Sequence, residues 1–324
     1  MIPEQALLTL PEALTGAGFP EQSYEGGIVG IYCLSLLQAL NGRNIPNPLS
    51  CIQMERPFRG RVPWPAPPQG NPRYLRGDIY LNIDQVRIGS VRLGAYGWRF
   101  HNWVEAKFFR KSTTNKQKNT GDLLADLLRI TALVPDVVKD GKTITGRYML
   151  HVYEAMQPND YLSINKNTGG GSEPRRWLDP LVNFCSDDCE PILLGDYEAA
   201  GILGEINDGL GDVQIEFSAT TTLVSPLYDL GEDHKQYTCA LSRIDSFKLV
   251  RGTTEFEVKA DRSVVFTPDE ATVMSEIREH IGQLVSTTKK SEETKPTLDE
   301  VGDGGVEAGG EADADVCEAE APVE

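Results

Sequence analysis

Two oppositely charged residues stand two positions apart in a segment that reads as a β-strand, residues 102–110. Side chains alternate between the two faces of a strand, so Glu105 and Lys107 point to the same face. The opposite face receives apolar residues, namely Val104, Ala106 and Phe108. A carboxylate and an ammonium side by side on a core strand are costly to bury without a purpose. A divalent metal ion that binds a phosphate would supply one.

A second set of carboxylates precedes this segment. Residues 78–83 alternate between apolar and polar side chains, which predicts a strand that begins at Asp78. Asp84 shares the face of Asp78 and stands nearer to Glu105 in the sequence, so it is a rival ligand. Magnesium takes oxygen ligands and commonly keeps several waters, so one or two carboxylates on adjacent strands suffice. Carboxylates on adjacent strands are thus compatible with the divalent metal ion suggested above, and the resemblance described below implies which of them would bind it.

Hydrophobic periodicity indicates the elements that would position these residues. A helical pattern covers residues 24–40, and a second helix is expected to begin with Thr120 as its N-cap and to run through Ile130. Residues 1–24 read as a short helical or irregular lead-in. Strands are expected over residues 49–54, 78–83, 102–110 and 143–154, with 86–96 as a continuing strand or a hairpin. The fold class is therefore α/β, with a mixed central sheet and flanking helices in αβββαβ order.

This order, with Asp78 opening one central strand and Glu105-Ala106-Lys107 in the next, resembles the PD-(D/E)xK nuclease superfamily, which includes type II restriction endonucleases. The resemblance covers about residues 24–155. It implies that Asp78 and Glu105 hold Mg²⁺, with the Ala106 carbonyl as a further ligand. It also implies that Lys107 orients the attacking water and stabilises the developing charge. Glu25, on the first helix, matches an additional ligand that some members carry.

Two features depart from the family pattern. Gly77 stands where a proline often precedes the family's Asp, and the step from Asp78 to Glu105 is long, at 27 residues. A hairpin through residues 86–96 would have to absorb that length. The alternative interpretation is that Glu105 and Lys107 form an exposed ion pair on a solvated sheet face, which contributes less than about 1 kcal/mol.

Charge is distributed unevenly along the chain. The net charge is −17, yet residues 56–118 hold thirteen Lys or Arg and three acids, a local balance of +10. A basic segment that contains the candidate metal-binding carboxylates suits a site that cuts a polyanion. DNA is the expected partner, with RNA as an open alternative. The residues expected to contact the nucleic acid are Arg73, Arg76, Arg99, Arg110, Lys111, Lys116 and Lys118.

The remainder of the chain is less informative. Residues 1–155 are expected to form the nuclease-like core with its lead-in, and residues 156–285 a β-rich region that contacts substrate. Within the latter, strands are expected over 213–224, 237–250, 254–258 and 263–266, and a helix over 268–285. Residues 286–324 contain twelve acids and three lysines, which predicts a solvated, disordered tail.

Several other classes of protein are disfavoured. No apolar run approaches the roughly 20 residues of a membrane helix, and the N-terminus lacks a secretory pattern. Six scattered cysteines in a chain of 324 residues favour a reducing cytoplasm. Cys185 and Cys189 could hold a metal only with two further ligands, so plain thiols are the favoured interpretation.

These observations predict a Mg²⁺-dependent endodeoxyribonuclease, of restriction or defence type, in which metal-activated water hydrolyses a phosphodiester. The resemblance also implies a homodimer. A different class remains open, namely a non-catalytic module on the same fold that binds nucleic acid or protein. Its acidic tail would regulate access to the basic face.

Overall fold

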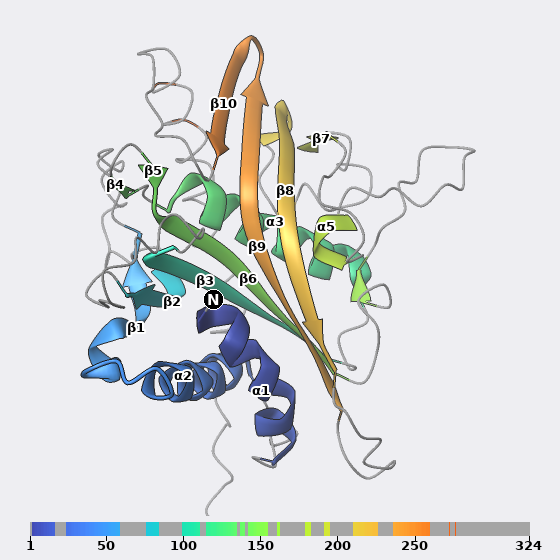
Figure 1. The fold of residues 1–324 in the computed structure, drawn as a ribbon. Helices are drawn as coiled ribbons and strands as arrows, with labels where there is room; N and C mark the ends of the chain where they lie inside the picture. The colour runs from blue at the N-terminus through green and yellow to red at the C-terminus, as the bar shows by residue number, and fades with distance from the viewer. Residues whose placement is uncertain are drawn as a thin grey trace, which may run out of the picture.

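The computed structural model shows one large mixed sheet with helices packed against both of its faces (Figure 1). The expected α/β class with a mixed sheet is confirmed. The structure describes residues 2–16, 24–58, 76–83, 99–110, 115–134, 137–139, 142–154, 161–162, 179–182, 191–194, 210–225 and 236–259, together with Thr272 and Glu276. Among the described helices, none is long and apolar enough to cross a membrane.

The eight-stranded sheet has the strand order β1-β2-β3-β6-β9-β8-β7, with β10 also paired to β9. The first three strands form an antiparallel meander, in which β2 (Arg76–Asn82) lies between β1 (Ile52–Pro57) and β3 (His101–Phe109). The fourth strand, β6 (Thr145–Glu154), lies parallel to β3. The chain reaches β6 through α3 (Lys116–Ala132) and the small hairpin of β4 (Val138–Lys139) and β5 (Lys142–Thr143).

The C-terminal strands extend this same sheet. The long strand β9 (Tyr237–Arg251) pairs with β6 through its first half and with β10 (Thr254–Lys259) through its second half. Its other edge carries β8 (Val213–Val224), which pairs in turn with β7 (Ile192–Leu193). A short helix, α5 (Asp179–Val182), packs against β8. The pairing of β6 with β9 thus joins residues on either side of position 155, where the sequence placed the boundary between the core and the β-rich region.

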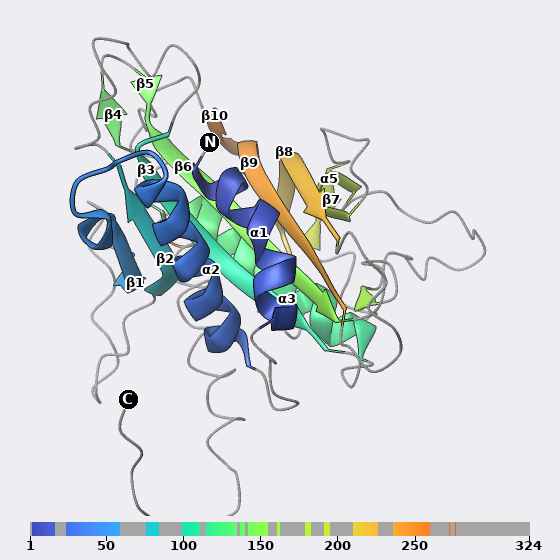
Figure 2. The ribbon, with the colours of Figure 1, turned by 60° about the horizontal axis from the view of Figure 1, so that its bottom comes forward.

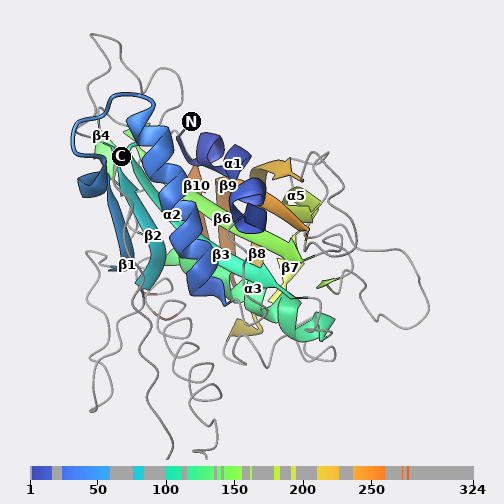
Figure 3. The same cartoon turned by 90° about the horizontal axis from the view of Figure 1, so that it is seen from below.

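Helices cover the two faces of the sheet separately. On one face, α1 (Ile2–Gly16) packs on β8 and β9, while α2 (Glu25–Asn41) packs on β2 and β3. Figures 2 and 3 show these two helices together on one side of the sheet and α3 on the other. One apolar core therefore lies between the sheet and α1 with α2, and a second lies between the sheet and α3.

Strand β3 contributes to both cores because its side chains alternate. Val104 and Ala106 belong to the core beneath α1 and α2, whereas Trp103 and Phe109 belong to the core beneath α3. Glu105 shares the face of the last two and therefore points toward α3.

Several element boundaries differ from the sequence-based expectation. The first half of segment 49–54 is a 3₁₀ turn, η1 (Pro48–Cys51), and β1 begins only at Ile52. The expectation that Thr120 caps the helix after β3 is wrong. Asn115 is the N-cap, and its side chain accepts a hydrogen bond from the Lys118 N–H at 3.1 Å. Thr120 lies inside the helix and donates its hydroxyl to the Lys116 carbonyl at 2.7 Å.

Other expected elements cannot be compared with the structure. Residues 86–96, 263–266 and 286–324 lie outside the described residues, as does segment 268–285 except for Thr272 and Glu276.

The cap at Asn115 gives a test of how α3 is held. Asn115→Ala removes the side-chain acceptor and leaves the Lys118 N–H to solvent, so we expect a loss of about 1 kcal/mol in unfolding free energy. Asn115→Asp keeps the acceptor and should remain within a few tenths of a kcal/mol of wild type. Urea unfolding of the three proteins measures both effects, and equal losses in the two variants would exclude the cap.

Candidate active site

The antiparallel pairing of β2 and β3 brings the two predicted carboxylates face to face. Ile79 is opposite Val104 and Tyr80 is opposite Trp103, so one further step along both strands brings Asp78 to Glu105. Their carboxyl groups are close enough to share a hydrogen bond. The long sequence separation comes from the residues between the end of β2 at Asn82 and the start of β3 at His101.

The backbone of β3 also holds Asp78 directly. The Ala106 N–H donates a hydrogen bond of 2.7 Å to Asp78 Oδ2, which fixes the carboxyl group against the strand that carries Glu105. The preceding residue, Gly77, lies against aromatic rings. A Cβ atom there would be 3.1 Å from ring atoms of both Phe58 and Trp103. The absence of a side chain at 77 thus lets β2 lie close to these rings.

Burial makes the carboxyl pair difficult to ionise. Glu105 is only 6% exposed, and its Oε1 atom has no hydrogen-bond partner among the described residues. Burial raises the pKa of Glu105 well above its usual value, and the neighbouring Asp78 raises it further. Burial also raises the pKa of Asp78, although the Ala106 N–H opposes that shift. Two carboxyl groups in contact in such surroundings resist carrying two negative charges together.

Lys107 places its ammonium group among three further acids. Its Nζ atom is 3.8 Å from Glu25 Oε2, at the start of α2, and 3.9 Å from Asp122 Oδ2 on α3. It is 3.5 Å from Asp126 Oδ2, also on α3. The Lys107 side chain is 20% exposed, so these attractions act in partly desolvated surroundings rather than on an open sheet face. The alternative of a fully solvated Glu105–Lys107 pair is thereby excluded.

A second cation, Arg129, enters the site from α3. Its guanidinium contacts the Asp126 carboxylate one turn earlier in the helix. The positive charge of Arg129 opposes the burial-driven rise in the pKa values of Asp78, Glu105 and Glu25, and Lys107 does the same for Asp78 and Glu25. Nothing in the sequence marked Arg129, Asp122 or Asp126 beforehand, apart from the helical spacing that places them on one face of α3.

The donor set suits a hard cation. Asp78, Glu105, Glu25, Asp122 and Asp126 supply five carboxyl groups against the two cations Lys107 and Arg129, so the fully ionised site would be strongly negative. Mg²⁺ needs only one or two carboxylates and retains waters. The Glu105 oxygen without a described partner is free to become a ligand beside Asp78. Within the described part of the chain, no group of three or more His, Cys, Asp or Glu side chains is arranged to hold a metal ion.

His151 is a neighbour of the site that the sequence did not connect with Lys107. The parallel register places it beside Lys107 on β6, where it is completely buried. Its Nδ1 atom is 3.3 Å from the Tyr153 hydroxyl. Burial lowers the pKa of His151 to about 3, and the Lys107 charge contributes, so the ring is neutral at physiological pH. Only the pairing of β3 with β6 shows that the two residues are adjacent.

The predicted nucleic-acid contacts are placed in part. Arg76 opens β2, Arg110 directly follows β3, and Lys116 and Lys118 begin α3, so these four lie toward the end of the sheet where β3 carries Lys107. Arg99 precedes β3 and lies at its opposite end. The remaining predicted site residues fall outside the described part of the chain, namely Arg73, Asp84 and Lys111.

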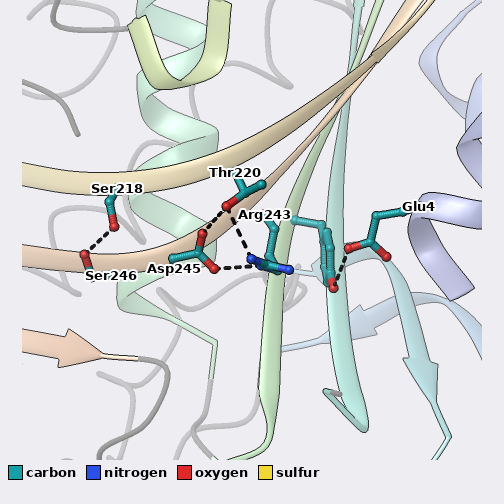
Figure 4. Close-up of polar contacts among 7 residues, drawn as sticks. Glu4, Ser218, Thr220, Arg243, Asp245 and Ser246 are labelled. Carbon is teal, nitrogen blue, oxygen red and sulfur yellow. Dashed lines mark hydrogen bonds and ion pairs between the residues drawn. The ribbon is translucent and has the colours of Figure 1, made fainter. Parts of the chain in front are cut away.

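A separate polar cluster lies on the other face of the sheet (Figure 4). Asp245 accepts hydrogen bonds from Thr220 Oγ1 at 2.6 Å and from Arg243 Nε at 2.7 Å. Nearby, the Tyr148 hydroxyl donates to Glu4 Oε1 of α1 at 3.5 Å. The first contacts join strands β8 and β9, and the last joins the central strand β6 to helix α1, so we interpret the cluster as part of the scaffold.

In comparisons with known proteins, no family model, no curated protein and no solved structure matches this chain.

The carboxyl pair predicts an unusual pH dependence of stability. Glu105→Gln removes a group that is costly to ionise and keeps an amide that can contact Asp78. Because the pKa of Glu105 is raised in the folded state, its stabilising effect is present below the unfolded pKa and is lost as the pH rises. We therefore expect the variant to exceed wild type by about 1 kcal/mol or more in unfolding free energy at pH 7.5 without divalent metal.

Urea unfolding at pH 7.5 and pH 4 measures this difference, which should shrink at the lower pH. The exposed Glu255, on β10, gives the matched control Glu255→Gln, which should change stability by less than about 0.5 kcal/mol. A Glu105→Gln protein that is less stable than wild type at pH 7.5 would contradict the description of the pair.

Proposed function

We propose that this protein is a Mg²⁺-dependent endodeoxyribonuclease whose active site contains Asp78, Glu105 and Lys107. The observation that carries the proposal is the contact between two carboxyl groups on adjacent strands, with an amine two residues along the same face. Burial makes this contact unfavourable for two ionised groups, and a bound cation would remove that disadvantage.

The connectivity of the fold supports the same proposal. From α2 to β6 the described elements follow the order helix, three strands, helix and strand, with the β4–β5 hairpin before the last strand. The three strands form an antiparallel meander and the fourth is parallel to the third. This connectivity supports the proposal because the resemblance to the PD-(D/E)xK nucleases implies an αβββαβ order.

Each residue has a separate task in the proposed reaction. Asp78 and Glu105 would hold the metal, with Glu25 close enough to Lys107 to join them. The ion, when bound, lowers the pKa of a coordinated water and neutralises charge on the phosphate. Lys107 supplies a fixed positive charge beside the reacting phosphate, where electrostatic stabilisation acts most strongly. The Ala106 N–H keeps Asp78 oriented throughout.

The basic residues near the site support DNA as the substrate. Arg76, Arg110, Lys116 and Lys118 flank the end of the sheet that carries Lys107, and the two lysines are exposed. Contacts of this kind bind the phosphate backbone without reading base sequence. Arg76 is paired with Glu55 at 2.8 Å and would exchange that partner for phosphate.

Cleavage of supercoiled plasmid DNA tests the proposed function. With Mg²⁺, wild type should nick or linearise the plasmid, and Lys107→Ala should lower the rate by about 100-fold or more because it removes charge stabilisation in the transition state. Glu105→Gln should abolish cutting that Mg²⁺ supports. Lys248→Ala, at a partly exposed lysine paired with Glu255, is the matched control and should retain about the wild-type rate.

Two results would count against an enzyme. Wild-type protein that binds DNA and RNA but cuts neither would favour the non-catalytic binding module. Cleavage that persists unchanged in both Lys107→Ala and Glu105→Gln would place the active site elsewhere.

A further inference from the structure

Asp126 connects the two cations of the site. Its side chain is only 4% exposed, and one of its oxygens lies 3.5 Å from Lys107 Nζ while the other contacts the Arg129 guanidinium. Without a carboxylate between them, two positive charges this close would repel each other in partly desolvated surroundings. Asp126 therefore holds Lys107 and Arg129 close to each other, and the charges of both act on Asp78.

Arg129 has donor capacity that Asp126 does not use. Its Nη2 atom contacts Asp126, whereas its buried Nε atom has no hydrogen-bond partner among the described residues. The side chain is 23% exposed, so part of the group is accessible to a ligand. A guanidinium presents five donors in a planar fork that matches the oxygens of a phosphate.

We propose that Arg129 is a second phosphate-binding catalytic residue, and that Asp126 is the positioning residue that aims it at the carboxyl pair. The inference rests on the proposed function, because it assigns Arg129 to the phosphate that Lys107 also contacts. A phosphodiester has two non-bridging oxygens, so an ammonium and a guanidinium can each bind one of them or share both. The anion would then sit against two cations on one side and the metal-binding carboxylates on the other.

A simpler role for Arg129 is to neutralise the acidic cluster by charge alone. The two roles differ in what a lysine at this position can do. Lysine keeps the charge and loses the planar fork, so neutralisation predicts that Arg129→Lys behaves like wild type. Phosphate binding through the fork predicts that Arg129→Lys is impaired nearly as much as Arg129→Gln.

Two assays separate these roles. In the first, DNA cleavage with Mg²⁺ is compared with binding of the same duplex when Ca²⁺ replaces Mg²⁺. We expect Arg129→Lys to lower kcat about tenfold or more, with Kd for the duplex changed by less than about threefold, because one phosphate contact among many contributes little to overall affinity. In the second assay, inorganic phosphate is titrated into each protein with Mg²⁺ present, and its affinity should fall about fivefold or more in Arg129→Lys.

Arg251→Lys is the matched control. Arg251 is a partly buried arginine, 20% exposed, that is ion-paired at 2.8 Å with Asp212 and lies at the end of β9 that pairs with β8 and β10 rather than with β6. It should match wild type in both assays, and the unfolding transitions of all variants should agree closely enough to show that each is folded.

The positioning role of Asp126 is tested by a double-mutant cycle. If Asp126 acts through Arg129, Asp126→Asn should weaken phosphate binding, and the Asp126→Asn/Arg129→Lys protein should be no weaker than the poorer single variant. Additive losses would show that Asp126 does not position Arg129.

The outcomes also separate this inference from the proposed function. Arg129-dependent phosphate binding in a protein that cuts no DNA or RNA would support the anion site and contradict the proposed nuclease function. DNA cleavage and phosphate affinity that are both unaffected by Arg129→Lys would overturn the inference and leave the nuclease. A wild-type protein that neither cuts nor binds phosphate would remove both.

Discussion

The contact between the Asp78 and Glu105 carboxyl groups is the constraint on which the site depends. Two ionised carboxylates in a partly desolvated position repel each other, and the metal-free protein relieves this repulsion through raised pKa values. A proton held by the pair has the same electrostatic effect as a bound cation would have. Under the proposed function, Mg²⁺ binding would therefore be accompanied by proton release, as expected wherever ligands must be deprotonated before they bind.

The surrounding fold holds the two carboxyl groups in contact and supplies cations that partly balance their charge. The register of β2 against β3 sets Asp78 opposite Glu105, and a slip of one residue would turn Glu105 into the apolar core beneath α1 and α2. The crossover through α3 returns a helix to the same face, and this helix carries Asp122, Asp126 and Arg129. Sheet and helix together supply both the excess of carboxylates and the cations that partly balance it.

Local sequence patterns were sufficient for the longer described strands and for the shared face of Glu105 and Lys107, because period-two alternation is a strong signal. They also indicated Asp78, and the family resemblance pointed to Glu25; the structure places these residues beside Glu105 and Lys107 respectively. They did not identify Asp126 or Arg129. A charged pair three residues apart on a helix usually faces solvent, and only tertiary packing shows which face is buried.

Two further differences between expectation and structure concern His151 and the start of α3. His151 was not associated with Lys107 because the register of a parallel pair leaves no trace in either strand alone. Thr120 was assigned as the cap because it directly precedes the apolar pattern of α3. The helix begins one turn earlier, in a polar stretch that has no apolar periodicity. Pairing between distant strands decides the first point, and a local side-chain cap that the apolar pattern does not mark decides the second.

Calorimetric titration with Mg²⁺ tests the central claim most directly. The experiment is run at pH 7 in two buffers with different enthalpies of ionisation, so that the difference in observed heat counts the protons released. The account predicts saturable binding accompanied by release of up to about one proton, and loss of that release in Glu105→Gln. Saturable binding without proton release, or release that persists in Glu105→Gln, would contradict it.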